Sequence, residues 1–451
     1  MPNPNEQLMA TWKQVWQQFD PVKPADGFHV PRRSYNPIAD VVAEQLLLPL
    51  DHQRFILAGG RGSGKSTELR AVGSQLAQHK DVILFDVDAH FAGVVRDEAA
   101  LQRVRPHELI GILGLAVLRA GKDWLGVVEW KGHDKRFAVA LSALQPADPT
   151  SSPTLDVPKL VKGMAVTVGS LAGGPPGGAI VAGGLAVLEG LMEGFEWRIG
   201  LPDQMARTDQ DLPVQALLAA TNALLDHVRD FSDRGLVIIL DGLDRVQDEQ
   251  TFQQLIVGSS LLSQLRADLV VTFDLGLVER HRNSLHAWNI LDFTYFPVAT
   301  RDGLTPDERG VTFLSEVVRK RLALINQPGL LTDAQIARLA FDSAGSVRDL
   351  LRLVRNVAVQ CMIRKLAIAD DVAIDKVLDR HRRDQEAGLH VGHYRVLQGL
   401  LADAERRLPE DPLVVYLLNR QLILAYPNES TWFLPHTALI KKTLTRAGAT
   451  S

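Results

Sequence analysis

The chain has 451 residues, which is enough for two or three domains and a substantial core. Hydrophobic residues make up 46% and charged residues 23%, as in ordinary soluble globular proteins. The formal net charge of −4 gives no reason to expect nucleic-acid binding by the chain as a whole, although a local basic patch stays possible. A single cysteine, Cys361, excludes an internal disulfide framework and a cysteine-rich zinc site. The first residues show no secretory signal, so a cytoplasmic location is expected.

The first 50 residues predict two helices separated by a proline-rich linker. Helical patterns cover residues 7–19 and 37–48. Pro21, Pro24 and Pro31 lie between them, and they prevent one continuous helix.

The most informative stretch is RFILAGGRGSGKST, residues 54–67, which fits the pattern G-x-x-x-x-G-K-[ST]. Its glycines let successive backbone amides point at one anion, and a helix predicted through residues 68–79 aims its positive end at the same charge. Lys65 would reach the β- and γ-phosphates, and Ser66 would bind Mg²⁺. The alternative is a glycine-rich turn with a chance lysine. The predicted nucleotide contacts are Gly59, Gly60, Arg61, Gly62, Ser63, Gly64, Lys65, Ser66 and Thr67.

An unusual segment follows a predicted strand at residues 81–88 and a predicted helix at 106–120. Residues 163–188 carry no charge and could nearly span a bilayer, but GGPPGG at 173–178 breaks them in the middle. We expect two short apolar arms in a buried or subunit-interface insertion. A mobile loop and a membrane-touching hairpin stay open as alternatives.

A second chemical motif follows a helix predicted at residues 213–231. In GLVIILD, residues 235–241, an apolar run ends in Asp241, which predicts a central parallel strand with its carboxylate at the ligand-binding edge. Asp241 would hold Mg²⁺ through water, beside Ser66. Gly242 stands where many ATPases place a glutamate that orients the attacking water. Asp244 is the nearest substitute base, or else a surface carboxylate paired with Arg245, in which case hydrolysis would be slow.

The next strands offer weaker candidates. The apolar run 269–273 predicts a strand, and Thr272 or Asp274 could contact the γ-phosphate or be satisfied by a neighbouring loop. Arg280 and Arg282 lie in a basic cluster that could supply an arginine finger to a neighbouring subunit, or could form a solvated face. Residues 293–298 are the predicted fifth strand.

The C-terminal part is predicted to be mainly helical. The patterns place helices near residues 306–325, 333–342, 346–366 and 370–383, then 394–407 and 412–420, followed by strands at 422–426 and 432–434. Arg348 lies at a helix N-terminus, where the helix dipole disfavours a cation, so an anionic partner is expected. The alternative is a solvated arginine paired with Asp349 or with another neighbour. The last elements suggest a small winged-helix domain that binds DNA or protein.

Together these motifs resemble those of AAA+ ATPases, in the branch shared by origin-recognition initiators and STAND signalling ATPases. GGRGSGKS at 59–66 resembles Walker A, LVIILDGLD at 236–244 resembles the STAND form of Walker B, and GSVRDLLRLVRNV at 345–357 resembles the sensor 2 helix. The resemblance implies ATP, Mg²⁺, a ring or partial ring of subunits, and a γ-phosphate sensor at Arg348. It also makes Tyr35 and Pro37 expected contacts near the nucleotide base.

The expected fold class is therefore α/β, a P-loop NTPase sheet flanked by helices. The expected domains are an N-terminal segment (1–40), an ATPase core (41–300) with an insertion at about 121–205, a helical lid (301–384) and a winged-helix-like domain (385–451).

The function we expect is that of a slow Mg²⁺-ATP-dependent ATPase that acts as a nucleotide-controlled oligomeric switch or scaffold for a partner protein. By resemblance alone, a role in bacterial stress or anti-phage defence would suit it. The alternatives are a DNA-binding initiator, loader or transposition-type ATPase, and a membrane-remodelling protein based on residues 163–188.

Overall fold

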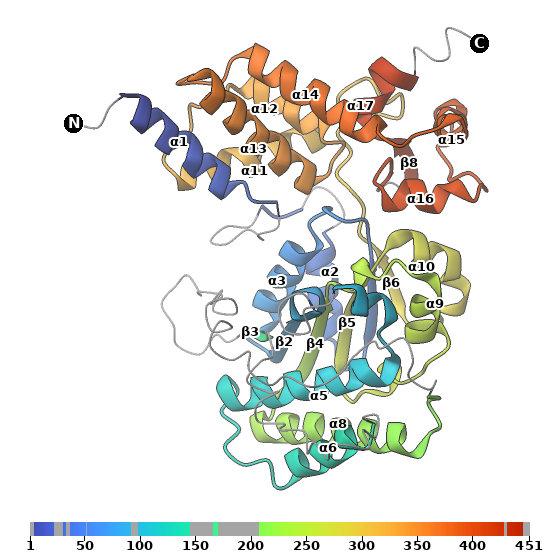
Figure 1. The fold of residues 1–451 in the computed structure, drawn as a ribbon. Coiled ribbons are helices and arrows are strands. Elements are labelled where there is room, and N and C mark those ends of the chain that lie inside the picture. The colour runs from blue at the N-terminus through green and yellow to red at the C-terminus, as the bar shows by residue number, and fades with distance from the viewer. Residues whose placement is uncertain are drawn as a thin grey trace, which may run out of the picture. The chain divides into compact units, whose positions relative to one another are not determined.

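The computed structural model describes residues 4–21, 30–32, 37–50, 52–91, 98–144, 166–169, 207–427 and 431–444 (Figure 1). They belong to two compact units. We call residues 38–58 and 68–292 the sheet unit, and residues 1–37, 59–67 and 293–451 the helical unit. Each unit is described by itself below.

The sheet unit is built on six strands in the order β3-β2-β4-β5-β1-β6. Five of them run parallel, and β3 pairs antiparallel with β2 at the edge. Parallel strands covered on both faces need continuous apolar runs, and every residue of β1 and β5 is buried. The predicted parallel sheet is thus confirmed. The strands are β1 (Arg54–Ala58), β2 (Lys80–Asp86), β3 (Val166–Gly169), β4 (Gly235–Asp241), β5 (Asp268–Phe273) and β6 (Asn289–Asp292).

Helix α5 (Pro106–Asp123) forms an inner layer of the sheet unit. It packs against β2 and β3 on one side and against α8 (Leu212–Ser232) on the other, and α6 (His133–Ser142) also packs on α8 (Figure 1). A helix buried on nearly all sides must be apolar all round, as GILGLAVL is. At Gly114 of α5, an added Cβ would lie 2.1 Å from the Phe137 ring of α6, so only glycine permits this packing.

The other α-helices that the structure describes in the sheet unit lie before or between its strands. They are α2 (Ile38–Leu47), α3 (Lys65–Leu76, whose first turn belongs to the helical unit), α4 (Val87–His90), α9 (Glu249–Phe252) and α10 (Leu275–His281). Of the apolar segment 163–188, only the backbone of β3 is described, and the predicted apolar arms otherwise lie outside the described residues. Among the helices that the structure describes, none combines the length and the apolar character needed to cross a bilayer.

The predicted fifth strand is wrong in position. The strand is β6, Asn289–Asp292, whereas residues 293–298 form a buried connection without strand pairing. The aromatic side chains within residues 293–298 are buried, but the backbone of this segment does not pair with a strand of the sheet. The backbone amide of Tyr295 donates to the carbonyl of Ala425, far along the chain. The edge strand itself is polar and partly exposed, so it gives little apolar signal.

The helical unit begins with α1 (Pro4–Gln18), which packs against α13 and α11. Trp12, Val15 and Phe19 are fully buried in one core with the lid helices, so α1 packs onto the lid. The lid helices lie close to the predicted ranges. They are α11 (Glu308–Leu324), α12 (Asp333–Asp342), α13 (Val347–Arg364) and α14 (Asp371–Glu386).

The last elements of the helical unit are α15 (Val391–Ala402), α16 (Leu413–Asn419), β7 (Ile423–Tyr426), β8 (Trp432–Pro435) and α17 (Thr437–Leu439). Strands β7 and β8 form the predicted antiparallel hairpin. The helix predicted to reach Arg407 ends at Ala402, because the Asp403 carboxylate accepts hydrogen bonds from the amides of Glu405 and Arg407 and turns the chain. The winged-helix assignment stays a prediction.

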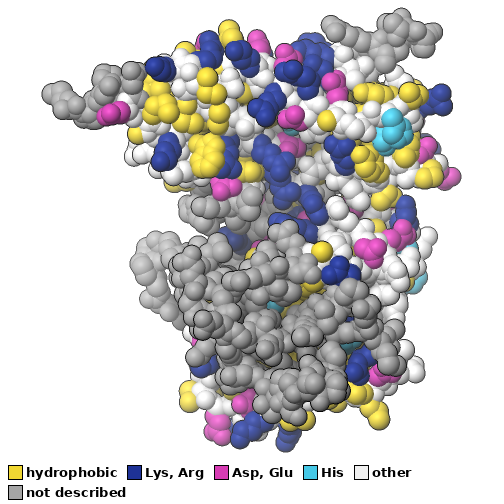
Figure 2. Space-filling view, in the orientation of Figure 1, with side chains coloured by type: hydrophobic (Ala, Val, Ile, Leu, Met, Phe, Trp, Pro, Cys, Tyr) yellow, Lys and Arg dark blue, Asp and Glu magenta, His cyan; other side chains and the backbone are white. Residues whose placement is uncertain are grey.

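Trp12 anchors α1, and its replacement by alanine is expected to cost about 3–5 kcal/mol of unfolding free energy. The indole is fully buried, and its Nε1 donates to the carbonyl of Leu366 at 2.7 Å. Trp16→Ala is the control. Trp16 is 38% exposed, and the Arg355 guanidinium lies 3.7 Å from its ring centroid. Figure 2 shows hydrophobic and basic side chains intermixed over the lid. Urea denaturation of both variants checks the prediction, and equal losses would contradict it.

Candidate functional site

The glycine-rich loop, residues 59–64, directly follows β1, and α3 begins at Lys65. Gly62 and Gly64 have φ values of 80° and 103°, a region that favours glycine. Gly59 and Gly60 are needed for a different reason, namely lack of space. An added Cβ would lie 2.6 Å from the Phe293 carbonyl oxygen at Gly59 and 2.1 Å from the Tyr295 hydroxyl at Gly60. The predicted strand, loop and helix are therefore present.

Lys65 is folded back onto the loop. Its Nζ donates to the carbonyl oxygens of Gly59 and Gly60, at 2.8 Å each, and the residue is 4% exposed. The Ser63 hydroxyl also donates to the Gly60 carbonyl, at 2.9 Å. The positively charged amino group of Lys65 thus lies inside the loop, at the N-terminus of α3, a helix of 12 residues. Left-handed glycines, a helix N-terminus and an inward lysine suit the phosphates of a nucleotide.

Other residues of the helical unit hold this loop from outside. The Arg61 carbonyl accepts hydrogen bonds from the Tyr295 hydroxyl, at 2.9 Å, and from the Gln421 side-chain amide. The carbonyl of Gly62 accepts from the backbone amide of Arg348, at 3.3 Å. Two carbonyls at the tip of the loop are therefore fixed by three separate segments. Sequence reasoning did not find Tyr295 or Gln421, because hydroxyl and amide groups so far from the loop in sequence carry no local pattern.

Arg348 reaches the loop because of the turn before α13. Ser346 caps α13 by accepting from the Asp349 amide at 3.2 Å. Gly345 has φ 83°, and an added Cβ would lie 2.0 Å from the Phe296 carbonyl oxygen. The turn brings the backbone so close that a Cβ at Gly62 would lie 2.6 Å from the Cβ of Arg348. The sensor residue expected from the resemblance is therefore adjacent to the phosphate loop, and its contact with a γ-phosphate stays a prediction.

Asp241 lies at the carboxyl end of β4, in the sheet unit, and is 5% exposed. The Gly242 amide donates to its Oδ1 at 2.9 Å and to the Thr272 hydroxyl at 3.0 Å. The Thr272 hydroxyl lies 3.5 Å from the same Asp241 oxygen. Thr272 is fully buried beside Asp241, and its contact with a γ-phosphate stays a prediction. Asp274 caps α10 by accepting from the amide of Gly276 at 2.8 Å.

Gly242 cannot carry a side chain in this structure. Its φ is 91°, and an added Cβ would lie 2.8 Å from the backbone nitrogen of Asp88 and 3.2 Å from Asp86 Oδ1. Asp86 ends β2, in register with Asp241 on β4. Arg245 forms an ion pair with Asp88 at 2.8 Å. Residues 86 and 88 thus occupy the space that a glutamate side chain at residue 242 would need. The sequence pattern identified this acidic pair only as the end of a strand.

The two arginine-finger candidates both have carboxylate partners within the sheet unit. Arg280 pairs with Glu249, and Arg282 pairs with Glu279 and, at 2.5 Å, with Asp292. These pairs are what a solvated face would show, and the finger role stays a prediction.

The other candidates receive no role from the structure. Tyr35 lies outside the described residues, and Pro37 directly precedes α2. In the described ranges, no three His, Cys, Asp or Glu side chains are arranged to hold a metal ion. Mg²⁺ at Ser66 and Asp241 stays a prediction.

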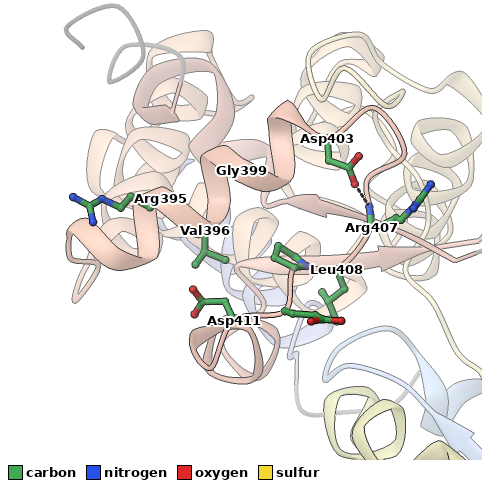
Figure 3. A pocket seen from close by; sticks show the side chains of 9 residues that line it. Arg395, Val396, Gly399, Asp403, Arg407, Leu408 and Asp411 are labelled. Atoms are coloured by element: carbon green, nitrogen blue, oxygen red, sulfur yellow. Dashed lines mark hydrogen bonds between the residues drawn. The ribbon is translucent and has the colours of Figure 1, made fainter.

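A separate hollow of about 470 Å³ lies in the C-terminal part of the helical unit (Figure 3). Helix α15 and the segment 407–411 line it, with Val396, Leu408 and Asp411 among the lining side chains. Arg395 extends away from these side chains. Five of the nine lining residues are charged, and we assign the hollow no ligand.

The fold and the loop define the class of protein. A parallel sheet flanked by helices, with a phosphate loop between the interior strand β1 and α3 and a helical lid after the sheet, is a P-loop NTPase fold, and the AAA+ branch stays a prediction. No protein-family model matches the sequence, and a search of curated proteins finds no match.

Three solved structures illustrate what the chain is similar to. The Aeropyrum pernix ORC1 protein in complex with DNA is 14% identical, covers 96% of this chain and 98% of its own, and gives a TM-score of 0.42. The ADP form of A. pernix ORC2 is 12% identical, covers 96% of both chains, and gives 0.40. A Thermotoga maritima RuvB variant is 14% identical, covers 92% and 94%, and gives 0.34. These similarities are distant, and the class rests on the strand order and the loop of this chain.

Proposed function

We propose that the chain is a Mg²⁺-ATP-binding and hydrolysing AAA+-type ATPase that works as a nucleotide-controlled oligomeric switch or scaffold for a partner protein. The observation that carries the proposal is the phosphate loop, with Lys65 turned inward and the Arg61 carbonyl held by Tyr295 and Gln421. A cytoplasmic location and a role in bacterial stress or anti-phage defence, as in STAND proteins, belong to the same proposal and rest on the resemblance alone.

In this proposal the loop amides and Lys65 bind the phosphates of ATP, and Arg348 senses the γ-phosphate. Ser66, and Asp241 through water, would hold Mg²⁺, which supplies charge neutralisation of the phosphates. Thr272 keeps the Asp241 carboxylate oriented. The fit is supported by the left-handed glycines and by the N-terminus of α3. Hydrolysis is slow, because residue 242 contributes no carboxylate.

The switch part of the proposal follows from what holds the loop. Arg61 and Gly62 are bonded to residues before, within and after the lid, namely Tyr295, Arg348 and Gln421. A phosphate that draws the loop amides toward itself must rotate the same peptide groups, and so it must strain or remake these bonds. Nucleotide occupancy therefore biases the lid, which is the type of element that ATP-driven assemblies use.

The test is size-exclusion chromatography with light scattering on the wild-type chain with ATP, with ADP, and with double-stranded DNA, together with phosphate release from ATP. We expect ATP, and not ADP, to produce a larger assembly without DNA. A chain that stays monomeric until DNA is added, in a complex that salt dissolves, would replace the proposal with the DNA-binding initiator or loader. A chain that neither binds nor hydrolyses ATP would overturn both.

A further inference from the structure

Strand β7 ends in two residues that connect the C-terminal hairpin to the phosphate loop and to the turn before α13, all within the helical unit. The carbonyl oxygen of Ala425 accepts from the backbone amide of Tyr295 at 2.9 Å, and the hydroxyl of Tyr295 holds the Arg61 carbonyl at the tip of the loop. The hydroxyl of Tyr426 donates to the carbonyl oxygen of Ala344, in the turn before α13, at 2.8 Å. A single strand thus fixes both the phosphate loop and the turn from which α13 starts.

The turn that Tyr426 contacts has a backbone conformation that is unfavourable by itself. Ala344 has φ 49° and Gly345 has φ 83°, so two successive residues are left-handed, and this conformation is costly for alanine. Tyr426 is fully buried, and burial raises the pKa of its hydroxyl, which therefore stays protonated and donates to the Ala344 carbonyl. The left-handed turn is thus stabilised by a hydrogen bond from outside the turn.

The conformation of this turn decides where Arg348 lies. The Ser346 amide donates to the Ser343 carbonyl at 2.9 Å, and the Ser346 side chain caps α13, so the turn and the start of the helix form one continuously bonded segment. The Arg348 amide donates to the Gly62 carbonyl at 3.3 Å, and a Cβ built on Gly62 would lie 3.5 Å from Cδ of Arg348. A rotation of the backbone at Ala344 must therefore shift the Arg348 side chain relative to the phosphate loop.

We propose that Tyr426 is a positioning residue for Arg348, and that the C-terminal hairpin thereby sets the preference of the site for ATP over ADP. This inference rests on the ATP binding proposed above and on the role of Arg348 as γ-phosphate sensor. With the Tyr426 hydroxyl in place, the turn holds Arg348 beside the loop before nucleotide arrives. Without it, the turn samples other conformations, and the apparent affinity for ATP falls with the population of the competent one. ADP has no γ-phosphate, so its binding does not draw on Arg348.

Two other contacts of the C-terminal segment are less suited to this role. The Thr437 hydroxyl donates to the Phe341 carbonyl at 2.7 Å, but Phe341 lies in α12, before the left-handed turn. Nε2 of His436 lies 3.9 Å from Oδ2 of Asp349, which is too long for a hydrogen bond. Of these three side chains, Tyr426 is the one that bonds to the turn itself.

The experiment measures the Kd of the full-length chain for a non-hydrolysable ATP analogue and for ADP, by calorimetry in the presence of Mg²⁺. Tyr426→Phe removes only the hydroxyl. We expect it to weaken binding of the ATP analogue about fivefold or more, as loss of one buried hydrogen bond allows, with the Kd for ADP within about twofold of wild type. Tyr416→Phe is the matched control. Tyr416 is 39% exposed and its hydroxyl accepts from Arg420 at 2.9 Å, so both Kd values should stay at the wild-type level.

A double-variant cycle separates positioning from a general loss of structure. Arg348→Ala should weaken binding of the ATP analogue and not of ADP, and adding Tyr426→Phe to it should cause no further loss, because the hydroxyl acts through the arginine. An unchanged Kd for the ATP analogue in Tyr426→Phe, equal weakening of both nucleotides, or additive losses in the double variant would overturn the inference while leaving the ATPase proposal standing. A wild-type chain that binds neither nucleotide would overturn the ATPase proposal itself.

Discussion

Replacing Lys65 with alanine is expected to weaken ATP binding by about 100-fold or more, since a charge-assisted contact to phosphate contributes roughly 2–5 kcal/mol. The physical reason is visible without nucleotide. Nζ already lies among carbonyl oxygens, 2.8 Å from those of Gly59 and Gly60, so the side chain is held inside the loop before any anion arrives. The variant should also lose ATP-dependent assembly, which light scattering would record.

The control for Lys65→Ala is Lys320→Ala on α11. Lys320 is half exposed and pairs with Glu316 at 3.1 Å, four residues earlier in the same helix, so its removal should change neither the Kd for ATP nor assembly. Thermal unfolding separates a binding effect from a folding effect, because Lys65→Ala also removes two internal hydrogen bonds. Binding of ATP by Lys65→Ala with the wild-type Kd would remove the basis for assigning the loop as a phosphate site.

The parts of the fold that the sequence predicts well are those with a strong local signal. The buried strands β1, β4 and β5 are continuous apolar runs, and α13 is an apolar stripe with a serine cap, so local chemistry and tertiary burial agree. The sequence pattern predicts β6 at the wrong residues, because apolar character and strand pairing do not coincide in this part of the chain. Its own residues are partly exposed, whereas the segment after it is buried without pairing in the sheet.

The same contrast applies to the candidate site. The motif residues Lys65 and Asp241 could be named because spacing and strand ends reveal them. Tyr295 and Gln421 could not, since their role is a hydrogen bond to one carbonyl of a loop more than 200 residues earlier in the chain. Asp86 is an intermediate case. Its strand ends in an acid just as β4 does, but only the pairing of β2 with β4 shows that the two acids are neighbours.

The second large effect concerns Gly242. Because resemblance places a glutamate there in typical AAA+ members, Gly242→Glu would be the obvious way to speed hydrolysis. We expect the opposite. A side chain at φ 91° costs roughly 1–2 kcal/mol of backbone strain. Its Cβ would also lie 2.8 Å from the backbone nitrogen and 2.9 Å from the Cβ of Asp88, and overpacking of this kind costs about 1–3 kcal/mol more.

Gly126 offers the matched comparison, because it has φ 73° and no atom within 4 Å of an added Cβ. Urea denaturation of Gly126→Ala should show the strain alone, about 1–2 kcal/mol, whereas Gly242→Ala should lose about 2–5 kcal/mol. Gly242→Glu must in addition displace Asp88 and Asp86, so its rate of ATP hydrolysis should fall below that of the wild-type chain. A Gly242→Glu variant that is as stable as wild type and hydrolyses ATP faster would contradict this prediction and would mean that the edge of the sheet can open to admit a glutamate.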